Sequence, residues 1–408
     1  MIAGVRRYGL AYADQGMTAL LSLLVTLWLI RRGSEEAFGA WVFWSSTGIV
    51  LGTAAAALTT VHLHRLPPEP PGRRTAERAI LSAGLAVTAV ATVGTVVAVI
   101  LLGPPLSVPE AVLFVPGTLL ASQARALAAS RGALAWAAAL SAFTLVAVVL
   151  GVAGGQLAGH GTAVGELLAL NGAAQGLAGA LVLRRLSGRD RPDFGRGGRR
   201  RWRVLWRRSS LTLAGGLASE AAGRLYVFLV PAMAGTAALG AIAAASTLLR
   251  PATLLTGAWA MAVRAPLAAA RARGDGAEFR RLLILGAAGP AATILLLGVA
   301  VAAGWPLVSR IVYGGRFPGL EGLVLSWTLQ MAIACFFIAG TVAAQAMGRL
   351  QASARADLAG AATCAATMPV LLLLFPPGVA LVALSLGGVV QVAVQWRALG
   401  AAVAKRAG

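Results

Sequence analysis

The stretch RRLSGRDRPDFGRGGRRRWRVLWRR, residues 184–208, divides this chain of 408 residues into two apolar halves. It contains eleven arginines together with Pro192 and several glycines, so it is too polar to be buried and too irregular for a long helix. On both sides of it, apolar blocks recur that are long enough to cross a hydrocarbon layer about 30 Å thick as helices. With 58% apolar and 12% charged residues, the chain is too apolar for one soluble domain, and its predicted solvent is lipid.

Cutting the apolar blocks at charges, prolines and glycine pairs gives twelve predicted transmembrane helices, six in each half. These spans cover residues 9–30, 38–61, 79–102, 111–130, 133–156, 162–183, 209–231, 237–262, 282–304, 320–346, 354–375 and 378–398. The sequence therefore predicts an all-α integral membrane protein. Its parts are an N-terminal six-helix bundle at 1–184, a basic cytoplasmic linker at 185–208 and a C-terminal six-helix bundle at 209–408.

The basic residues alternate from one gap to the next. Of the 35 Lys and Arg residues, 29 lie at the termini or in every second gap, whereas four lie in the gaps between them. Because cytoplasmic loops carry the excess of Lys and Arg, both termini are predicted to be cytoplasmic. The same distribution explains the net charge of +21 without a nucleic-acid partner, since no separate basic fold or base-stacking motif is present. The linker either docks onto anionic membrane lipids or a partner, or serves as a topological anchor alone.

The two halves carry a short internal repeat. Phe38-Gly39-Ala40 matches Leu239-Gly240-Ala241 at an offset of 201 residues, and Arg7 matches Arg208 at the same offset. Because six spans is an even number, both halves begin on the same side of the membrane. This predicts a parallel, pseudo-twofold repeat about an axis along the membrane normal, with substrate sites between the repeats.

The sequence contains no motif that indicates catalysis. The outer gaps contain no pair of carboxylates, no His cluster and no nucleophile motif, and no Gly-rich phosphate loop followed by Lys occurs in the inner gaps. Cys335 and Cys364 both lie inside apolar stretches, where they read as packing residues. The sequence predicts no enzyme, no cofactor and no metal site.

Four ionisable residues interrupt the apolar spans, where a charge costs about 2.5–3.5 kcal/mol and so faces a cavity or a partner. They are Asp14, Glu220, Arg224 and Arg250. Glu220 and Arg224 share a helix face. They form either an ion pair that cancels charge, or a site in which Arg224 binds an anionic substrate while Glu220 modulates that binding or exchanges a proton. Arg250 has no acidic residue within four positions, so its charge must be balanced by a protein carboxylate from elsewhere or by a phosphate of a ligand. A phosphate suits it because the planar guanidinium can donate two hydrogen bonds to one phosphate.

Other polar residues lie within the first half. Asp14, early in the first span, either couples proton binding to the closing of a gate or pairs with a basic residue across the bundle. Asn171 and Gln175 lie four residues apart on the sixth span. They either line a polar cavity or form hydrogen bonds between helices.

Several short motifs recur in a characteristic order. They are Phe38-Gly39, the run from Leu239-Gly240-Ala241 to Arg250-Pro251, Ala265-Pro266-Leu267, and Gly304-Trp305-Pro306-Leu307-Val308 with Ile311-Val312-Tyr313-Gly314. In order and spacing, the chain resembles the polysaccharide-transporter branch of the superfamily that includes multidrug and toxic compound extruders, lipid-linked oligosaccharide flippases and peptidoglycan precursor flippases. The resemblance implies two six-helix bundles in a V shape, around a cavity that opens to each side in turn.

The resemblance also implies a function. It is the transfer of an undecaprenyl-pyrophosphate-linked oligosaccharide between the leaflets of a bacterial plasma membrane, with Arg224 and Arg250 holding the pyrophosphate. Matching arginines are absent from the interior of the first two spans, which argues against a peptidoglycan-specific protein. Partners would be the lipid-linked substrate, membrane lipids, and the glycosyltransferases and polymerase of polysaccharide synthesis. The alternatives are a cation-coupled extruder of drugs or metabolites, which would use Asp14 and Glu220, and a non-transporting membrane scaffold for polysaccharide synthesis.

Overall fold

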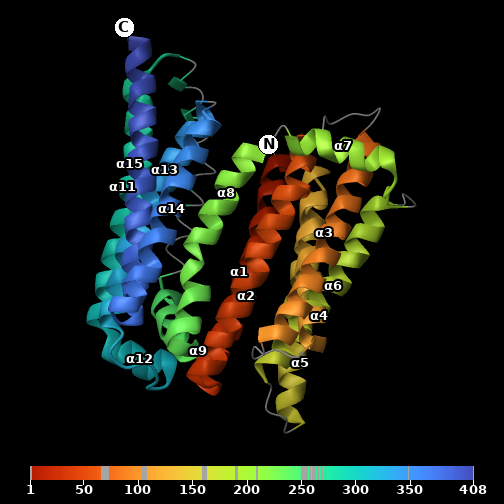
Figure 1. The fold of residues 1–408 in the computed structure, drawn as a ribbon, viewed down its shortest axis with the longest axis vertical. Coiled ribbons are helices and arrows are strands. Elements are labelled where there is room, and N and C mark those ends of the chain that lie inside the picture. Colours follow the sequence, from red (N-terminus) through yellow and green to blue (C-terminus); the bar gives the residue numbers. More distant parts are fainter. Residues whose placement is uncertain are drawn as a thin grey trace. The chain divides into compact units, whose positions relative to one another are not determined.

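A computed structural model gives the fold of the chain. It describes residues 2–65, 73–102, 108–158, 163–188, 192–207, 210–249, 273–347 and 349–407, together with 256, 259, 263, 266, 267, 270 and 271. Throughout these ranges every regular element is a helix (Figure 1), which confirms the predicted all-α class. Two compact units emerge: Met1–Val25 with Trp44–Ser210, and Thr26–Phe43 with Leu211–Gly408.

The first unit is built from the first seven α-helices. They are α1 (Ile2–Arg32), α2 (Glu35–Leu58), α3 (Arg73–Leu102), α4 (Val108–Ser130), α5 (Leu134–Leu157), α6 (Val164–Ser187) and α7 (Arg196–Arg207), with a 3₁₀ turn, η1 (Thr60–Arg65), after α2. The ends of α1 and α2 that face each other in sequence, residues 26–43, group with the second unit. The break between the units at Ser210 falls next to the predicted end of the basic linker at residue 208.

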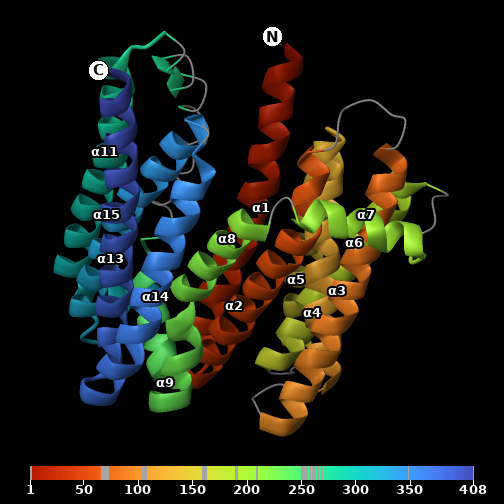
Figure 2. The same ribbon diagram turned by 45° about the horizontal axis from the view of Figure 1, so that its top comes forward.

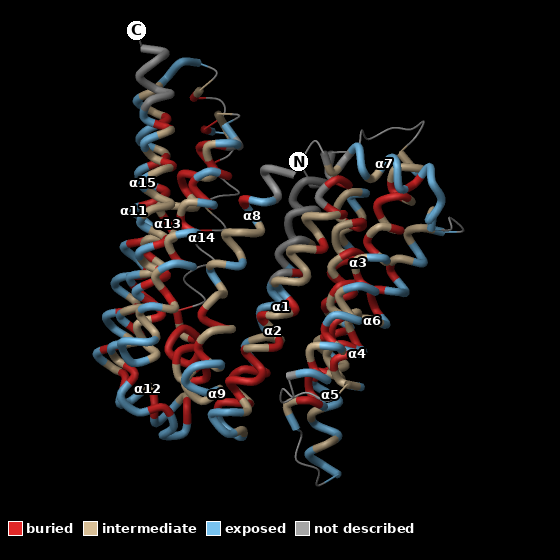
Figure 3. The backbone as a smooth tube through the Cα atoms, in the orientation of Figure 1, coloured by how far each residue is buried: buried red, intermediate tan, exposed pale blue. Residues whose placement is uncertain are grey.

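Glycines bring α4 and α6 into close contact. A Cβ atom on Gly117 would lie 1.9 Å from the carbonyl oxygen of Gly172, and one on Gly172 would lie 2.3 Å from the Cα of Phe114. Such small residues allow the backbones of membrane helices to approach each other closely. Van der Waals contacts then hold the helices together, because the hydrophobic effect does not drive association within lipid. Accordingly, 56% of an apolar 18-residue stretch of α4 is buried, the largest share among the candidate spans. Buried residues, red in Figure 3, recur along this helix.

The basic linker contains a regular helix that the sequence expectation missed. Within α7, the rings of Trp202 and Trp206 stack with centroids 6.3 Å apart, and the indole of Trp202 donates a hydrogen bond of 2.7 Å to the carbonyl of Leu58. The spacing of four between the two tryptophans is the helical signal, and the surrounding arginines and glycines masked it. Six of the eleven arginines therefore lie on a helix that packs along α3.

The second unit contains α8 (Ser210–Gly223), α9 (Leu225–Thr247), α11 (Gly276–Ala303), α12 (Trp305–Tyr313), α13 (Glu321–Ala346), α14 (Leu350–Leu374) and α15 (Ala380–Ala407), with the 3₁₀ turn η2 (Pro377–Val379). The helices α11, α13, α14 and α15 lie side by side in both ribbon views (Figures 1 and 2). In the described part of the chain, ten helical stretches are long and apolar enough to cross a membrane.

One of these stretches, Ala214–Thr247, contains 34 residues and is bent. Gly235 within α9 has φ 83° and ψ 165°, a conformation that interrupts the helix, and Pro231 precedes it. The boundary predicted between residues 231 and 237 coincides with this kink. A single apolar run therefore supplies both the seventh predicted span and the start of the eighth.

Candidate functional site

The first unit holds a charged cluster among three of its helices. Asp14 on α1 is 7% exposed and forms an ion pair of 3.5 Å with the Nε atom of Arg125 on α4. Ser141 on α5 donates a hydrogen bond of 2.5 Å to the same carboxylate oxygen and accepts one of 3.0 Å from Arg125. Of the two predicted roles for Asp14, pairing across the bundle is therefore present, which leaves proton coupling as a proposal.

Arg125 has a different place from the one expected from sequence. The alternation of charges had counted it among the residues that mark the inner face of the membrane, but it belongs to the candidate span Val108–Ser130, five residues before its end. Its side chain is 27% exposed and reaches the buried carboxylate of Asp14. A charge in this position is stabilised by a partner rather than by water alone.

The polar pair on α6 forms a bond within its own helix. The side-chain amide of Gln175 donates a hydrogen bond of 3.0 Å to the side-chain Oδ1 atom of Asn171, and both residues are half-buried. The bond lies along α6 and so differs from the interhelical bond that was one expectation. A role of these two residues in lining a cavity stays a prediction.

In the second unit, Glu220 and Arg224 form an ion pair with 2.5 Å between Oε1 and Nε. The pair lies at a break in the helix, because α8 ends at Gly223 and α9 begins at Leu225, with Arg224 in a non-helical conformation between them (φ −113°, ψ 5°). The side chains are 33% and 28% exposed, respectively. The two charges therefore neutralise each other, yet about a third of each side chain is exposed.

The second predicted cavity arginine, Arg250, lies outside the described residues. Its relation to Arg224 and its place in an anion site therefore stay predictions.

A buried acid in the second unit was missed at the sequence level. Asp357 on α14 is 9% exposed, its Oδ1 atom has no hydrogen-bond partner, and its carboxylate interacts with the hydroxyl of Ser219 on α8. Gln391 on α15 donates a hydrogen bond of 3.1 Å to the same hydroxyl. The signal was available, because Asp357 falls inside the predicted span 354–375 and interrupts it as Asp14 interrupts the first.

A small cavity adjoins this group. Its volume is about 160 Å³, and Ser219, Gln330 and Gln391 contribute its polar lining. Glycines make room for it: a Cβ atom on Gly360 would lie 2.1 Å from the Cγ of Gln391. The second unit thus combines a buried carboxylate, a hydroxyl and two amides from four helices, α8, α13, α14 and α15, a set that can hold a proton or a small cation.

A tight seam closes one end of the second unit. Its two sides are residues 26–43, from α1 and α2, and the segment around Gly240 in α9. A Cβ atom on Gly39 would lie 1.9 Å from the carbonyl oxygen of Thr236, and one on Gly240 would lie 2.6 Å from that of Glu35. Gly39 and Gly240 are the two glycines that the internal repeat matches, so the seam is formed by equivalent positions of the two halves.

Further contacts hold the same seam. Arg31 donates hydrogen bonds of 2.9 and 2.8 Å to the carbonyls of Val312 and Ile311 on α12, and Phe38 packs edge-on against Phe317 with centroids 6.2 Å apart. Arg31, one of the few arginines in the outer gaps, thus satisfies two carbonyl groups at the end of α12. Among the described residues no group of three or more His, Cys, Asp and Glu side chains gathers as metal ligands would.

Comparison with known proteins places this architecture. No family model and no curated protein sequence matches the chain. Solved structures do: the lipid II flippase MurJ in an inward closed conformation superposes with a TM-score of 0.70 at 12% identity, over 95% of this chain and 86% of the flippase. The chain has a MATE-like fold. A multidrug resistance MATE family transporter of the MOP superfamily, in an inward-facing conformation, gives 0.64 at 12% identity, over 96% of both chains.

A eukaryotic MATE transporter gives a TM-score of 0.62 at 13% identity, over 97% of this chain and 96% of that one. The MATE-like fold predicted from the ordered motifs is therefore confirmed, and the chain is a multi-pass membrane protein. The similar structures are transporters rather than enzymes.

Proposed function

We propose that the chain is a transporter that moves an undecaprenyl-pyrophosphate-linked oligosaccharide from one leaflet of a bacterial plasma membrane to the other by alternating access. Its MATE-like fold supports this proposal, and the accessible ion pair at the break between α8 and α9 carries it. A charged pair that is about a third exposed inside a span would be very costly against lipid, so its exposed part belongs in a water-filled cavity.

Within that cavity Arg224 is the anion ligand. Its guanidinium can donate to a pyrophosphate while Glu220 keeps it oriented, and an arginine stays charged at any relevant pH. The lipid tail stays in the bilayer while the sugars cross through the polar interior. Arg250 would add a second guanidinium from the next helix.

The seam at Gly39 and Gly240 is the proposed outer gate. At Gly39 and Gly240 backbone meets backbone, so the two sides can close tightly there, and opening would also break the hydrogen bonds of Arg31 to α12 and the contact of Phe38 with Phe317. With both termini cytoplasmic, as the arginine pattern predicts, this seam lies on the extracytoplasmic side. The three predicted parts of the chain, 1–184, 185–208 and 209–408, then act as one bundle, a cytoplasmic connection and a second bundle.

Net transport requires that a ligand or ion bind the inward-open and outward-open states with different affinity. A ligand that binds both states equally well leaves their populations unchanged. The Asp14–Arg125 pair and the buried carboxylate of Asp357 are the groups that could supply it by binding a proton or a cation in one state only. Removal of the product outside the membrane, by a polymerase or by glycosyltransferases acting with this protein, would add to the bias.

The second candidate is a cation-coupled extruder of small amphiphiles. The MATE transporters among the similar structures favour it, as do the intramembrane acids Asp14, Glu220 and Asp357. An extruder would need these carboxylates for every cycle and would not need Arg224 as an anion ligand. The two functions therefore differ in which charge is indispensable.

The test is the export of surface glycan in a strain that depends on this gene, with drug resistance measured in parallel. We expect Arg224→Ala to abolish glycan export at normal protein levels, and Arg310→Ala, on α12 of the same unit, to leave it intact. Lipid-linked oligosaccharide should accumulate in the inner leaflet of the Arg224→Ala strain. Normal glycan in that strain, with drug resistance lost in the Asp357→Asn strain, would assign the protein to the extruders.

A further inference from the structure

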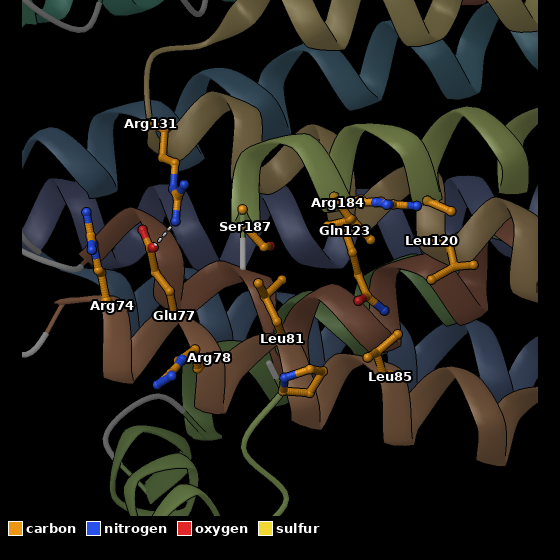
Figure 4. A pocket seen from close by; sticks show the side chains of 14 residues that line it. Arg74, Glu77, Arg78, Leu81, Leu85, Leu120, Gln123, Arg131, Arg184 and Ser187 are labelled. Atoms are coloured by element: carbon orange, nitrogen blue, oxygen red, sulfur yellow. Dashed lines mark hydrogen bonds and ion pairs between the residues drawn. The ribbon is translucent and has the colours of Figure 1, made fainter. Parts of the chain in front are cut away.

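A second polar cavity lies wholly within the first unit, away from the residues assigned to transport. It is bounded by α3, α4, α6 and the start of the linker, has a volume of about 440 Å³, and is shown in Figure 4. Its charged lining consists of four arginines, Arg74, Arg78, Arg131 and Arg184, and the single carboxylate of Glu77, and Gln123 and Ser187 add an amide and a hydroxyl.

That carboxylate is already occupied. Glu77 is 2% exposed, and its two oxygens accept from Arg73 at 2.9 Å and from Arg131 at 2.5 Å. Across the described ranges, neither Arg74 nor Arg184 pairs with a carboxylate. The cavity therefore has an excess of positive charge that no acid of its own lining neutralises, so an anion from outside completes it.

The rest of the lining is apolar. Leu81, Leu85, Leu120 and Leu183 belong to it, and Figure 4 shows Leu85 and Leu120 at the far end from Arg74 and Arg131. Eleven residues of α3 separate Arg74 from Leu85, a rise of about 16 Å. This is about half the thickness of a hydrocarbon layer, so the cavity runs from the depth of headgroups to that of acyl chains.

A buried polar atom faces the same space. Gln123 on α4 is 2% exposed and lines the cavity; its amide donates to Thr88 at 2.9 Å, but its Oε1 atom has no hydrogen-bond partner. Gly84 lies against that oxygen and leaves it room, since a Cβ atom there would be 2.7 Å away. An unpaired buried acceptor is unfavourable.

From these three features we infer that the cavity between α3, α4 and α6 is a binding site for an anionic glycerophospholipid of the adjoining leaflet. The phosphodiester binds Arg74 at the headgroup end, an ester oxygen further along the lipid accepts a hydrogen bond from Arg184, which Figure 4 shows beside Leu120, and one acyl chain follows the leucines. Basic pockets between membrane helices on the arginine-rich side recognise such lipids. A soluble phosphate carries the negative charge but has no acyl chain, and a zwitterionic lipid has the acyl chains but no net charge.

The experiment is native mass spectrometry of the full chain released from vesicles of phosphatidylcholine alone or with phosphatidylglycerol at one part in five. We expect one phosphatidylglycerol to be retained per chain and phosphatidylcholine not to replace it. The double variant Arg74→Gln/Arg184→Gln should bind it at least about tenfold more weakly, because two charge-assisted contacts are lost. Arg200→Gln/Arg203→Gln on α7 removes the same charge outside the cavity and should change binding less than about twofold.

Two further arms separate the sources of phosphate. Leu85→Trp fills the apolar end and should weaken lipid binding while leaving the arginines in place. Inorganic phosphate at millimolar concentration should fail to displace the lipid. Equal retention by both double variants would overturn the inference, and displacement by inorganic phosphate with no effect of Leu85→Trp would make the cavity a site for free anions instead. Thermal melting of each variant in phosphatidylcholine checks that it is folded.

Discussion

The seam between Gly39 and Gly240 makes a prediction that a single methyl group can test. In the closed seam a Cβ atom at position 39 would lie 1.9 Å from the carbonyl oxygen of Thr236 and 2.7 Å from its carbonyl carbon. Both are backbone atoms, which cannot turn away as the end of a flexible side chain would. The variant Gly39→Ala must therefore push α2 and α9 apart wherever the seam is closed, and it costs nothing where the seam is open.

The size of the effect follows from this overlap. Overpacking a close contact by one methyl group costs about 1–3 kcal/mol. If the whole cost falls on the closed state, the ratio of open to closed molecules rises by about 5- to 150-fold. Because the alanine also favours the helix itself, a control with the same exchange in the same helix is needed.

The assay is the labelling rate of a buried cysteine by a polar maleimide. Ala40 is 5% exposed and is the neighbour of Gly39, so Ala40→Cys reports on opening of the seam. The native thiols Cys335 and Cys364 are buried and are replaced by alanine in the background. When closing is faster than labelling, the rate is proportional to the open fraction, so Gly39→Ala should raise it by the factor above.

The matched control is Gly52→Ala, also in α2, where a Cβ atom would have no neighbour within 4 Å. It should label at the rate of the parent. If Gly39→Ala also labels at the parental rate while the protein stays folded, the seam does not hold the state proposed here. The reasoning from the glycine contacts would then be wrong.

Three further predictions concern the interior of each unit. Asp14→Asn should lower the melting temperature of the purified protein because it leaves the Arg125 guanidinium without its carboxylate, at a cost of about 3 kcal/mol, and adding Arg125→Gln should recover most of it; equal melting of all three proteins would refute the pairing. Gly117→Ala should disrupt the contact of α4 with α6 and abolish folded protein in size-exclusion profiles, whereas Gly94→Ala, which meets nothing within 4 Å, should elute normally. Tyr313→Phe should cost about 1 kcal/mol in denaturant unfolding, because its hydroxyl donates 3.0 Å to the carbonyl of Ala244, and an unchanged midpoint would contradict this.

Much of the fold could be predicted from the sequence because lipid imposes simple rules. Apolar length gives the helices, and the kink at Gly235 falls where the apolar run had to be cut. The repeat offset matched Gly39 with Gly240, and the structure brings these two positions together. What the sequence could not give is which of the 50 glycines make contacts, since a glycine alone does not name its partner.

The polar sites were harder to predict for the same reason. Arg125 was counted with its end of the membrane because only packing brings α1 and α5 to it. An ion pair of Glu220 and Arg224 was one of the two expectations, because a spacing of four brings the side chains together locally, but the helix break at Arg224 was not expected. Asp357 needed the convergence of α8, α14 and α15 to stand out from its apolar span.

In the proposed transport cycle, Arg224 binds the phosphate of the lipid-linked substrate during its passage across the membrane. The most direct measurement is the flipping of undecaprenyl-pyrophosphate-linked oligosaccharide in vesicles that contain the purified protein, read by enzymatic access to the sugar from outside. We expect rapid flipping by the parent, partial flipping by Arg224→Lys, and a loss to the rate of empty vesicles for Arg224→Ala. Flipping by Arg224→Ala at the parental rate, or none by the parent, would contradict it.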